Sequence, residues 1–226
     1  MAAVMRQEAV DFRYPATYTD ARGSERTIIA NDSDTLRVRL RGVDFAGQDF
    51  DALSPTEGAT PKQLRQFTLQ QGDLCSCRIE CQIAVPIGGR IKTNGTLLVD
   101  LVLGDPAPNG GIDRENLHLV LQFDDRTFSS PGTSVWFRDE LLAIQAQLPE
   151  GVFIKACINC LYSDYSPYGH GLFGCMMCFR NLKAEYLKVT TKNEFWSVHD
   201  RPDRMVQETY LCPEFERRVP GTGYRG

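Results

Sequence analysis

Two short cysteine pairs near the carboxyl end carry the clearest chemistry in this sequence. Cys157 and Cys160 form one Cys-x-x-Cys step, and Cys175 and Cys178 form a second, with fourteen residues between the steps. Thiolates at this spacing are typical ligands of a tetrahedral zinc site, because each step lets two sulfur atoms reach one ion. The sequence therefore predicts bound zinc in this part of the chain.

The residues alone leave the fourth ligand open. Cys212 lies in a Tyr-Leu-Cys-Pro-Glu segment and could replace Cys175 if the carboxyl-terminal segment folds back. We expect a helix to begin near Cys175 and run to about Val189, with the positive end of its dipole favouring thiolates. A thioredoxin-like redox site is disfavoured, since a helix should start at the first cysteine and a loop follows Cys160 instead.

The loop between the two cysteine pairs is where catalytic residues would lie. Asp164, Tyr165, Tyr168 and His170 could converge beside a metal with an open position, giving a hydrolase-like, metal-dependent enzyme. The sequence has no nucleophile elbow, phosphate-binding loop or His-Glu-x-x-His motif. We therefore favour a binding role, with Tyr162, Tyr165 and Tyr168 as an exposed contact surface.

Alternating apolar residues predict the strands that must position this region. Leu36, Val38 and Leu40 alternate with arginines, and similar runs recur over 74–85, 96–103 and 117–123. Cys75, Cys77 and Cys81 fall in register with Ile and Val in one of these runs, so we expect core residues there. His118 falls on the polar side of its run, so we expect a surface histidine.

One helix follows the strands. Thr133 or Ser134 should cap a helix that runs to about Leu148 and buries Phe137, Leu141, Ile144 and Leu148. The predicted fold is α+β: a mainly antiparallel, sandwich-like β-sheet with one packed helix and a carboxyl-terminal, cysteine-rich, zinc-binding lobe. We expect residues 1–150 to form the strand-rich domain and residues 151–226 the lobe, packed together as one compact unit.

Charge and hydropathy restrict the partners. The chain has 226 residues, a net charge of −4 and a pI near 5.5, which argues against binding to duplex nucleic acid. No uncharged run is long enough for a membrane span or a signal peptide, so we expect a cytoplasmic protein with reduced cysteines. Arg217, Arg218 and Arg225 make the tail basic, which suits either a solvated tail or an anion-binding one.

The last third also resembles a known pattern. The run from Cys160 to Gly174, the triplet Cys178-Phe179-Arg180 and the segments Glu208 to Phe215 and Gly223 to Gly226 resemble an uncharacterised bacterial family, a domain of unknown function. The resemblance spans most of the chain, and its most distinctive motifs lie in the last third. The resemblance implies no established activity. It implies that the ligand set is Cys157, Cys160, Cys178 and Cys212, with Cys175 as the competing fourth ligand.

These observations predict a zinc-stabilised cytoplasmic binding or accessory protein. An immunity-type or gene-cluster accessory role would fit such a protein, and its partner would be another protein or a small ligand. The metal-dependent enzyme is the alternative interpretation.

Overall fold

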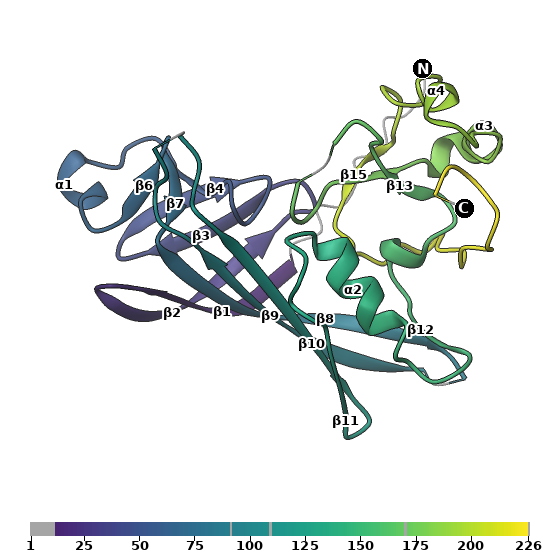
Figure 1. The fold of residues 1–226 in the computed structure, drawn as a ribbon, viewed down its shortest axis with the longest axis horizontal. Coiled ribbons are helices and arrows are strands. Elements are labelled where there is room, and N and C mark those ends of the chain that lie inside the picture. Colours follow the sequence, from purple (N-terminus) through teal and green to yellow (C-terminus); the bar gives the residue numbers. More distant parts are fainter. Residues whose placement is uncertain (1–11, 91, 109, 170, 226) are drawn as a thin grey trace, which may run out of the picture.

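The chain folds around one large antiparallel sheet. The computed structural model describes residues 12–90, 92–108, 110–169 and 171–225, and within them ten strands join in the order β11-β10-β9-β8-β1-β2-β3-β4-β5, with β12 paired to β8 (Figure 1). The prediction of a mainly antiparallel, β-rich fold is confirmed. These strands are β1 (Phe12–Asp20), β2 (Gly23–Asn31), β3 (Leu36–Leu40), β4 (Val43–Gly47), β5 (Ser54–Pro55), β8 (Cys77–Gly89), β9 (Thr93–Leu103), β10 (Glu115–Phe123), β11 (Arg126–Ser129) and β12 (Val152–Ile154).

Two-residue turns join neighbouring strands. Arg41 and Gly42 connect β3 to β4, and Asp124 and Asp125 connect β10 to β11; all four residues have positive φ. That conformation lets a two-residue hairpin follow the right-handed twist of its strands. The turns are therefore short enough to keep sequence neighbours adjacent in the sheet.

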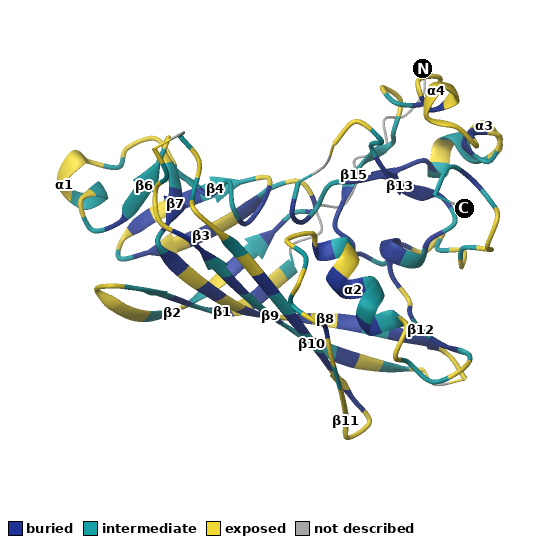
Figure 2. Cartoon of the chain, viewed as in Figure 1, coloured by how far each residue is buried: buried dark blue, intermediate teal, exposed yellow. Residues whose placement is uncertain are grey.

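Buried apolar residues alternate with more exposed residues along the strands, so the inner face of the sheet is apolar (Figure 2). Leu36, Val38 and Leu40 of β3 are buried, whereas Arg37 and Arg39 are exposed. The same alternation holds along β8, β9 and β10. The inward rows therefore form the main core, as the sequence predicts.

The amino-terminal cysteines contribute to this core. Cys77 and Cys81 are buried among apolar side chains, and burial raises the pKa of each thiol to about 12. The single strand expected over 74–85 is wrong at one point, because Ser76 has a φ of 51° and interrupts it. Cys75 consequently belongs to β7 (Asp73–Cys75), which pairs with β6 (Thr68–Gln70) beyond the short helix α1 (Pro61–Leu64).

The predicted helix is α2 (Phe137–Gln145), which packs beside β10. Its buried stripe includes Phe137, Leu141 and Ile144, as expected, whereas Leu148 lies beyond the end of the helix and is only partly buried. The expected cap is wrong: the helix begins after Trp136, which makes no side-chain cap. The Glu140 carboxylate instead accepts the backbone N–H groups of Gly132, Thr133 and Ser134.

Residues 157–225 form a carboxyl-terminal lobe beside α2 and the sheet (Figure 1). In the described part of this lobe three antiparallel strands pair: β13 (Ser163–Tyr165), β14 (Met176–Cys178) and β15 (Arg204–Val206). The short helices are η1 (Cys157–Asn159), η2 (Arg180–Leu182), α3 (Lys183–Tyr186) and α4 (Lys192–Phe195). None of the helices in the described residues has the length and apolar character of a membrane span.

The helix expected from Cys175 to Val189 is wrong. Cys178 ends β14, because the backbone of Met177 pairs with β13 on one side and β15 on the other. No long helix dipole therefore acts on these thiols. The domain boundary at residue 150 stays a prediction.

Aromatic rings attach the lobe to the rest of the molecule. Phe173 is fully buried, with its ring centroid 4.7 Å from that of Phe137 on α2 and 5.1 Å from that of Phe50 after β4. The backbone N–H of Phe137 also donates to the carbonyl of Leu172 at 3.2 Å. Because buried aromatic rings remove large apolar areas from water, this contact contributes strongly to the attachment.

A buried aspartate lies beside the aromatic contact. Asp49 accepts hydrogen bonds from the backbone N–H groups of Phe50 at 2.7 Å and Phe173 at 3.0 Å. Burial raises the pKa of Asp49 well above its usual range, and the nearby Asp51 raises it further. The lobe is thus attached through an acid that favours its protonated form.

A second buried acid comes from the lobe. Glu208 is fully buried and accepts hydrogen bonds from the Gly174 N–H and the Tyr165 hydroxyl, each at 2.9 Å. Burial raises its pKa to about 7. Folding therefore takes up a proton at this position in mildly acidic solution.

Replacing Phe173 with Ala should lower the free energy of unfolding by about 3–5 kcal/mol, because a buried ring is lost and a cavity remains. Urea denaturation measures the change. Ile28→Ala is the control: Ile28 is 48% exposed, so its loss should change the free energy by about 0.5 kcal/mol or less. Similar effects for the two variants would contradict the assigned role of Phe173.

Glu208 should make the protein less stable as pH rises. Its folded pKa is raised, so the stabilisation is fully present below about 4.5 and is lost as pH rises to about 7. Glu208→Gln should reduce this fall in the free energy of unfolding, measured by urea denaturation at several pH values. Glu57→Gln, which removes an exposed carboxylate, should retain the fall; an unchanged slope in Glu208→Gln would refute the assignment.

Candidate metal centre

Backbone pairing brings distant cysteine segments together in the lobe. The Cys157 N–H donates to the carbonyl of Tyr210 at 2.7 Å, so the segment that carries Cys212 runs beside η1. Cys178 pairs with Ser163 in the register of β13 and β14. Three stretches that are far apart in sequence therefore meet around the end of β12.

Cys157, Cys160, Cys178 and Cys212 form a buried thiol cluster. Their exposed fractions are between 3% and 7%. The Cys157 thiol interacts electrostatically with the other three thiols, and Cys212 interacts with Cys160 and Cys178. The structure thus brings together the four cysteines that the resemblance implies as ligands.

Cys175 lies in different surroundings. Its sulfur accepts the Gly171 N–H at 3.1 Å and lies 4.0 Å from a carboxylate oxygen of Asp49. Burial and the Asp49 charge raise the pKa of this thiol to about 12. Cys175 precedes β14 whereas Cys178 ends it, so the two thiols lie in different surroundings.

The thiol cluster is not arranged as a formed metal site. Within the described ranges, no set of three or more His, Cys, Asp or Glu side chains is placed to hold a metal ion. The eight cysteines of the chain are all free. The donor chemistry of the cluster suits zinc, which thiolates bind at a Zn–S distance of about 2.3 Å.

Burial favours the protonated form of three of the clustered thiols, Cys157, Cys178 and Cys212. It raises the pKa of Cys157 well above its ordinary value, where the three neighbouring thiols add to the effect, and it also raises the pKa of Cys178 and Cys212. Two arginines act in the opposite direction. Arg204 favours the thiolate of Cys157, and Arg180 favours those of Cys178 and Cys212. A cation would be needed to stabilise several thiolates here.

The loop residues considered for catalysis point in different directions. Asp164 accepts the Tyr186 hydroxyl at 2.6 Å, whereas the Tyr165 hydroxyl donates to Glu208 at 2.9 Å. The Tyr168 hydroxyl donates to the backbone of Lys192. His170 lies outside the described residues. Asp164, Tyr165 and Tyr168 therefore do not converge on one reacting position.

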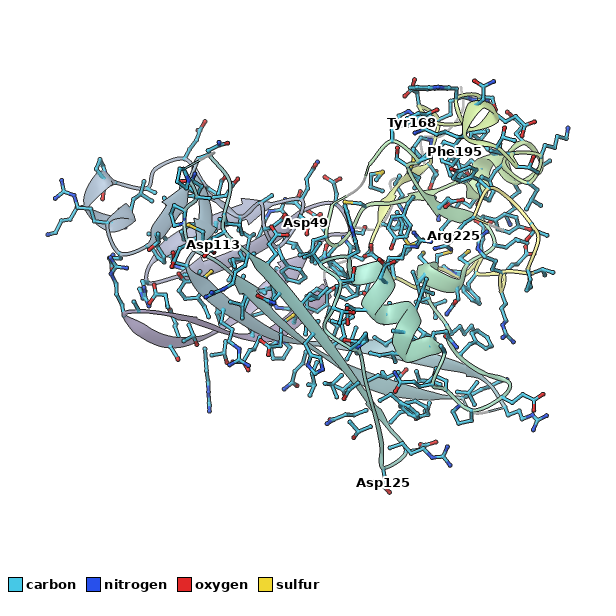
Figure 3. All side chains as sticks on the ribbon, in the orientation of Figure 1. Asp49, Asp113, Asp125, Tyr168, Phe195 and Arg225 are labelled. Carbon is cyan, nitrogen blue, oxygen red and sulfur yellow. The ribbon has the colours of Figure 1, made fainter. Side chains whose placement is uncertain are left out.

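The expected exposed tyrosine surface is wrong for two of its three members. Tyr162 and Tyr165 are buried, while Tyr168 is 40% exposed. Tyr168 stacks on Trp196 of the lobe at 4.3 Å between ring centroids, and Trp196 is 56% exposed. Figure 3 shows Tyr168 at the outer edge of the lobe, where this aromatic pair forms a small surface patch.

Several buried polar residues were not predicted from the sequence. Asp49 and Glu208 carry strongly perturbed pKa values, and Arg225 lies within the lobe (Figure 3). Phe173, which donates to Asp49, and Gly174, which donates to Glu208, are distant from these acids in sequence, so local patterns do not identify the contacts.

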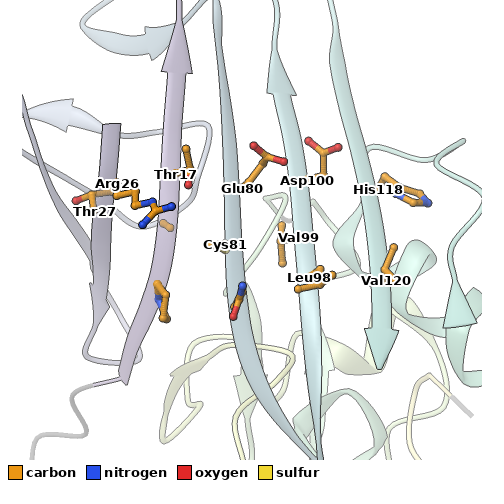
Figure 4. Close-up of a pocket in the computed structure, with 13 residues that line it drawn as sticks. Thr17, Arg26, Thr27, Glu80, Cys81, Leu98, Val99, Asp100, His118 and Val120 are labelled. Carbon is orange, nitrogen blue, oxygen red and sulfur yellow. The ribbon is translucent and has the colours of Figure 1, made fainter. Parts of the chain in front are cut away.

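Another pocket lies away from the lobe, on the outer face of the sheet (Figure 4). Its volume is about 650 Å³, and a polar row crosses it through Thr17, Glu80, Asp100 and His118. Arg78 pairs with Asp100 at 2.7 Å. His118 lies on the outer face, as predicted.

Comparison with known proteins adds a family but no activity. Residues 12–163, more than half of the chain, match the model of a family of unknown function, DUF6304. This range contains Cys157 and Cys160, whereas Cys178 and Cys212 follow it. No curated protein and no solved structure matches the chain. The expectation of an uncharacterised family is confirmed: the chain belongs to the family of unknown function DUF6304.

Proposed function

We propose that this chain is a zinc-stabilised binding or accessory protein whose lobe is a zinc-binding lobe. Cys157, Cys160, Cys178 and Cys212 would hold the ion. The observation that carries the proposal is that three separate segments contribute four mutually interacting, buried thiols. Eight free cysteines are in keeping with a reducing compartment, and we propose the cytoplasm.

Zinc would act here as a structural link. It would supply a positive charge that converts buried thiols to thiolates and joins η1, β14 and the carboxyl-terminal segment. Arg180 and Arg204 lie where their charges assist loss of the thiol protons. The lobe contains a three-stranded sheet and short helices. A bound zinc ion would therefore add stability to the small core of the lobe.

A catalytic role for the metal has less support. Asp164 is 2% exposed and already accepts the Tyr186 hydroxyl and the Arg225 backbone N–H. Tyr165 is likewise committed to Glu208. A binding role has a candidate contact surface in the exposed pair Tyr168 and Trp196, because aromatic side chains give large contact areas with little loss of entropy.

The protein purified under reducing conditions with zinc should contain about one zinc ion per chain. Cys212→Ser should lose most of this zinc, whereas the matched control Cys175→Ser should retain it. Elemental analysis of the monodisperse fraction gives the stoichiometry. The proposal fails if the folded, unsubstituted protein contains no zinc even when zinc is supplied. It also fails if Cys212→Ser keeps its full zinc content.

Cobalt substitution should give the absorption spectrum of a four-thiolate site, unchanged by added anions, because a closed site has no exchangeable position. A spectrum that changes with added anions would favour the enzyme alternative. Metal affinity should fall as pH is lowered, because burial raises the pKa of Cys157, Cys178 and Cys212 and protons then compete with the ion. Affinity independent of pH would argue against thiolate ligands.

A further inference from the structure

A pocket of about 560 Å³ lies in the lobe beside the start of α2. Its volume is in the range of small-molecule sites. Ser166, Pro167 and Gly169 of the loop after β13 form one part of its wall. The remaining lining residues come from α2, β13 and the carboxyl-terminal segment: Trp136, Arg138, Asp164, Tyr165, Tyr224 and Arg225.

Arg225 is the most buried cation of this pocket. Its side chain is 10% exposed, and its Nη2 donates to the carbonyl of Ile158 at 2.9 Å. Its Nη1 has no hydrogen-bond partner among the described residues although it is shielded from water. Buried donors of this kind are uncommon, because each one forfeits its hydrogen bond to water.

Arg138 places a second cation in the same wall. Its Nε is also buried without a hydrogen-bond partner in the described part of the chain, and no carboxylate there lies within ion-pair distance of it. The guanidinium carbons of Arg138 and Arg225 lie 5.7 Å and 5.9 Å from the centroid of the Tyr165 ring. Both cations are therefore close to one aromatic ring at the pocket.

The acid in the pocket wall does not neutralise both cations. One oxygen of Asp164 accepts the Tyr186 hydroxyl at 2.6 Å and the Arg225 backbone N–H at 3.2 Å, and the other accepts the Tyr165 N–H at 2.8 Å. The nearest approach of an Arg225 guanidinium nitrogen to Asp164 is 3.9 Å. The lining residues thus carry two positive charges and one negative charge that is already well bonded.

The first turn of α2 adds to this positive potential. Trp136 occupies the position just before the helix, and Arg138 lies within the first turn. The positive end of the helix dipole is therefore at the pocket. The acids of that turn bond elsewhere: Asp139 accepts the Ser134 hydroxyl and Glu140 accepts backbone N–H groups before the helix. Trp136 and Tyr224 supply apolar surface beside the cations.

We infer that this pocket binds a small organic anion, in which a carboxylate or phosphate group joined to an apolar or aromatic body contacts Arg138 and Arg225. A guanidinium group matches the two oxygens of either anion, and burial strengthens the charge-assisted bonds. The apolar body would lie against Trp136 and Tyr224. The inference names a ligand class for the proposed binding role. It rests on that proposed function, because the pocket requires an intact lobe.

The two tryptophans of the chain make the test direct. Trp196→Phe leaves Trp136, which lines the pocket, as the single tryptophan reporter. Phenyl phosphate, benzoate and the uncharged benzyl alcohol are then titrated while tryptophan fluorescence is recorded. The first two probes distinguish a phosphate from a carboxylate site, and the third measures binding without a charge.

We expect a saturable response to at least one anionic probe at concentrations up to about 1 mM and a much weaker response to benzyl alcohol. Arg138→Gln and Arg225→Lys should each weaken binding about tenfold or more, because each disturbs a charged hydrogen bond. Arg126→Gln removes an equal charge from the exposed strand β11 and should leave the affinity unchanged.

Zinc content and the urea midpoint are measured for every variant, so that loss of the metal or of the fold is distinguishable from loss of the anion. The inference is overturned if no anionic probe gives saturable binding to the folded protein. It is also overturned if folded Arg138→Gln and Arg225→Lys both bind the anionic probe as tightly as the Arg126→Gln control.

Discussion

The lobe depends on the return of the carboxyl-terminal segment across η1. The N–H groups of Cys157, Ile158 and Leu161 donate to carbonyls of Tyr210, Glu208 and Glu216, at 2.7–2.9 Å. These backbone contacts bring Cys212 to the other thiols and Glu208 to Tyr165. It also sets the course of the tail that carries Arg225 into the pocket. The candidate metal centre and the candidate anion site therefore share one backbone register.

Buried polar bonds make that register specific. Gln207 donates to Asn31 at 3.0 Å, and Asn31 donates to the Tyr14 hydroxyl at 3.1 Å, so the segment is joined to β1 and β2. If the segment were shifted by one residue, another side chain would take the position of Gln207. Buried polar groups would then lose their hydrogen-bond partners, which is costly. The aromatic contact of Phe173 supplies attachment, whereas these polar bonds select one arrangement of the lobe.

The strands and their inward rows could be predicted because they depend on local periodicity. The alternation over 36–40 and 117–123 matched the buried rows of β3 and β10, and the stripe of α2 was correct except at Leu148. The helix expected from Cys175 failed because β13 and β15 supply backbone partners for β14, and no local pattern records such partners. The buried acids Asp49 and Glu208 were missed for the same reason, because residues distant in sequence supply their contacts.

The sequence by itself determined a β-rich fold, a core containing Cys77 and Cys81, and a cysteine-rich carboxyl-terminal region, because side-chain type and spacing specify these features. Only the tertiary structure decided that Cys212 joins Cys157 whereas Cys175 faces Asp49. Which thiols meet depends on the strand pairing that positions Cys178 and on the path of a chain segment more than thirty residues later. Those are long-range backbone contacts, which side-chain spacing does not encode.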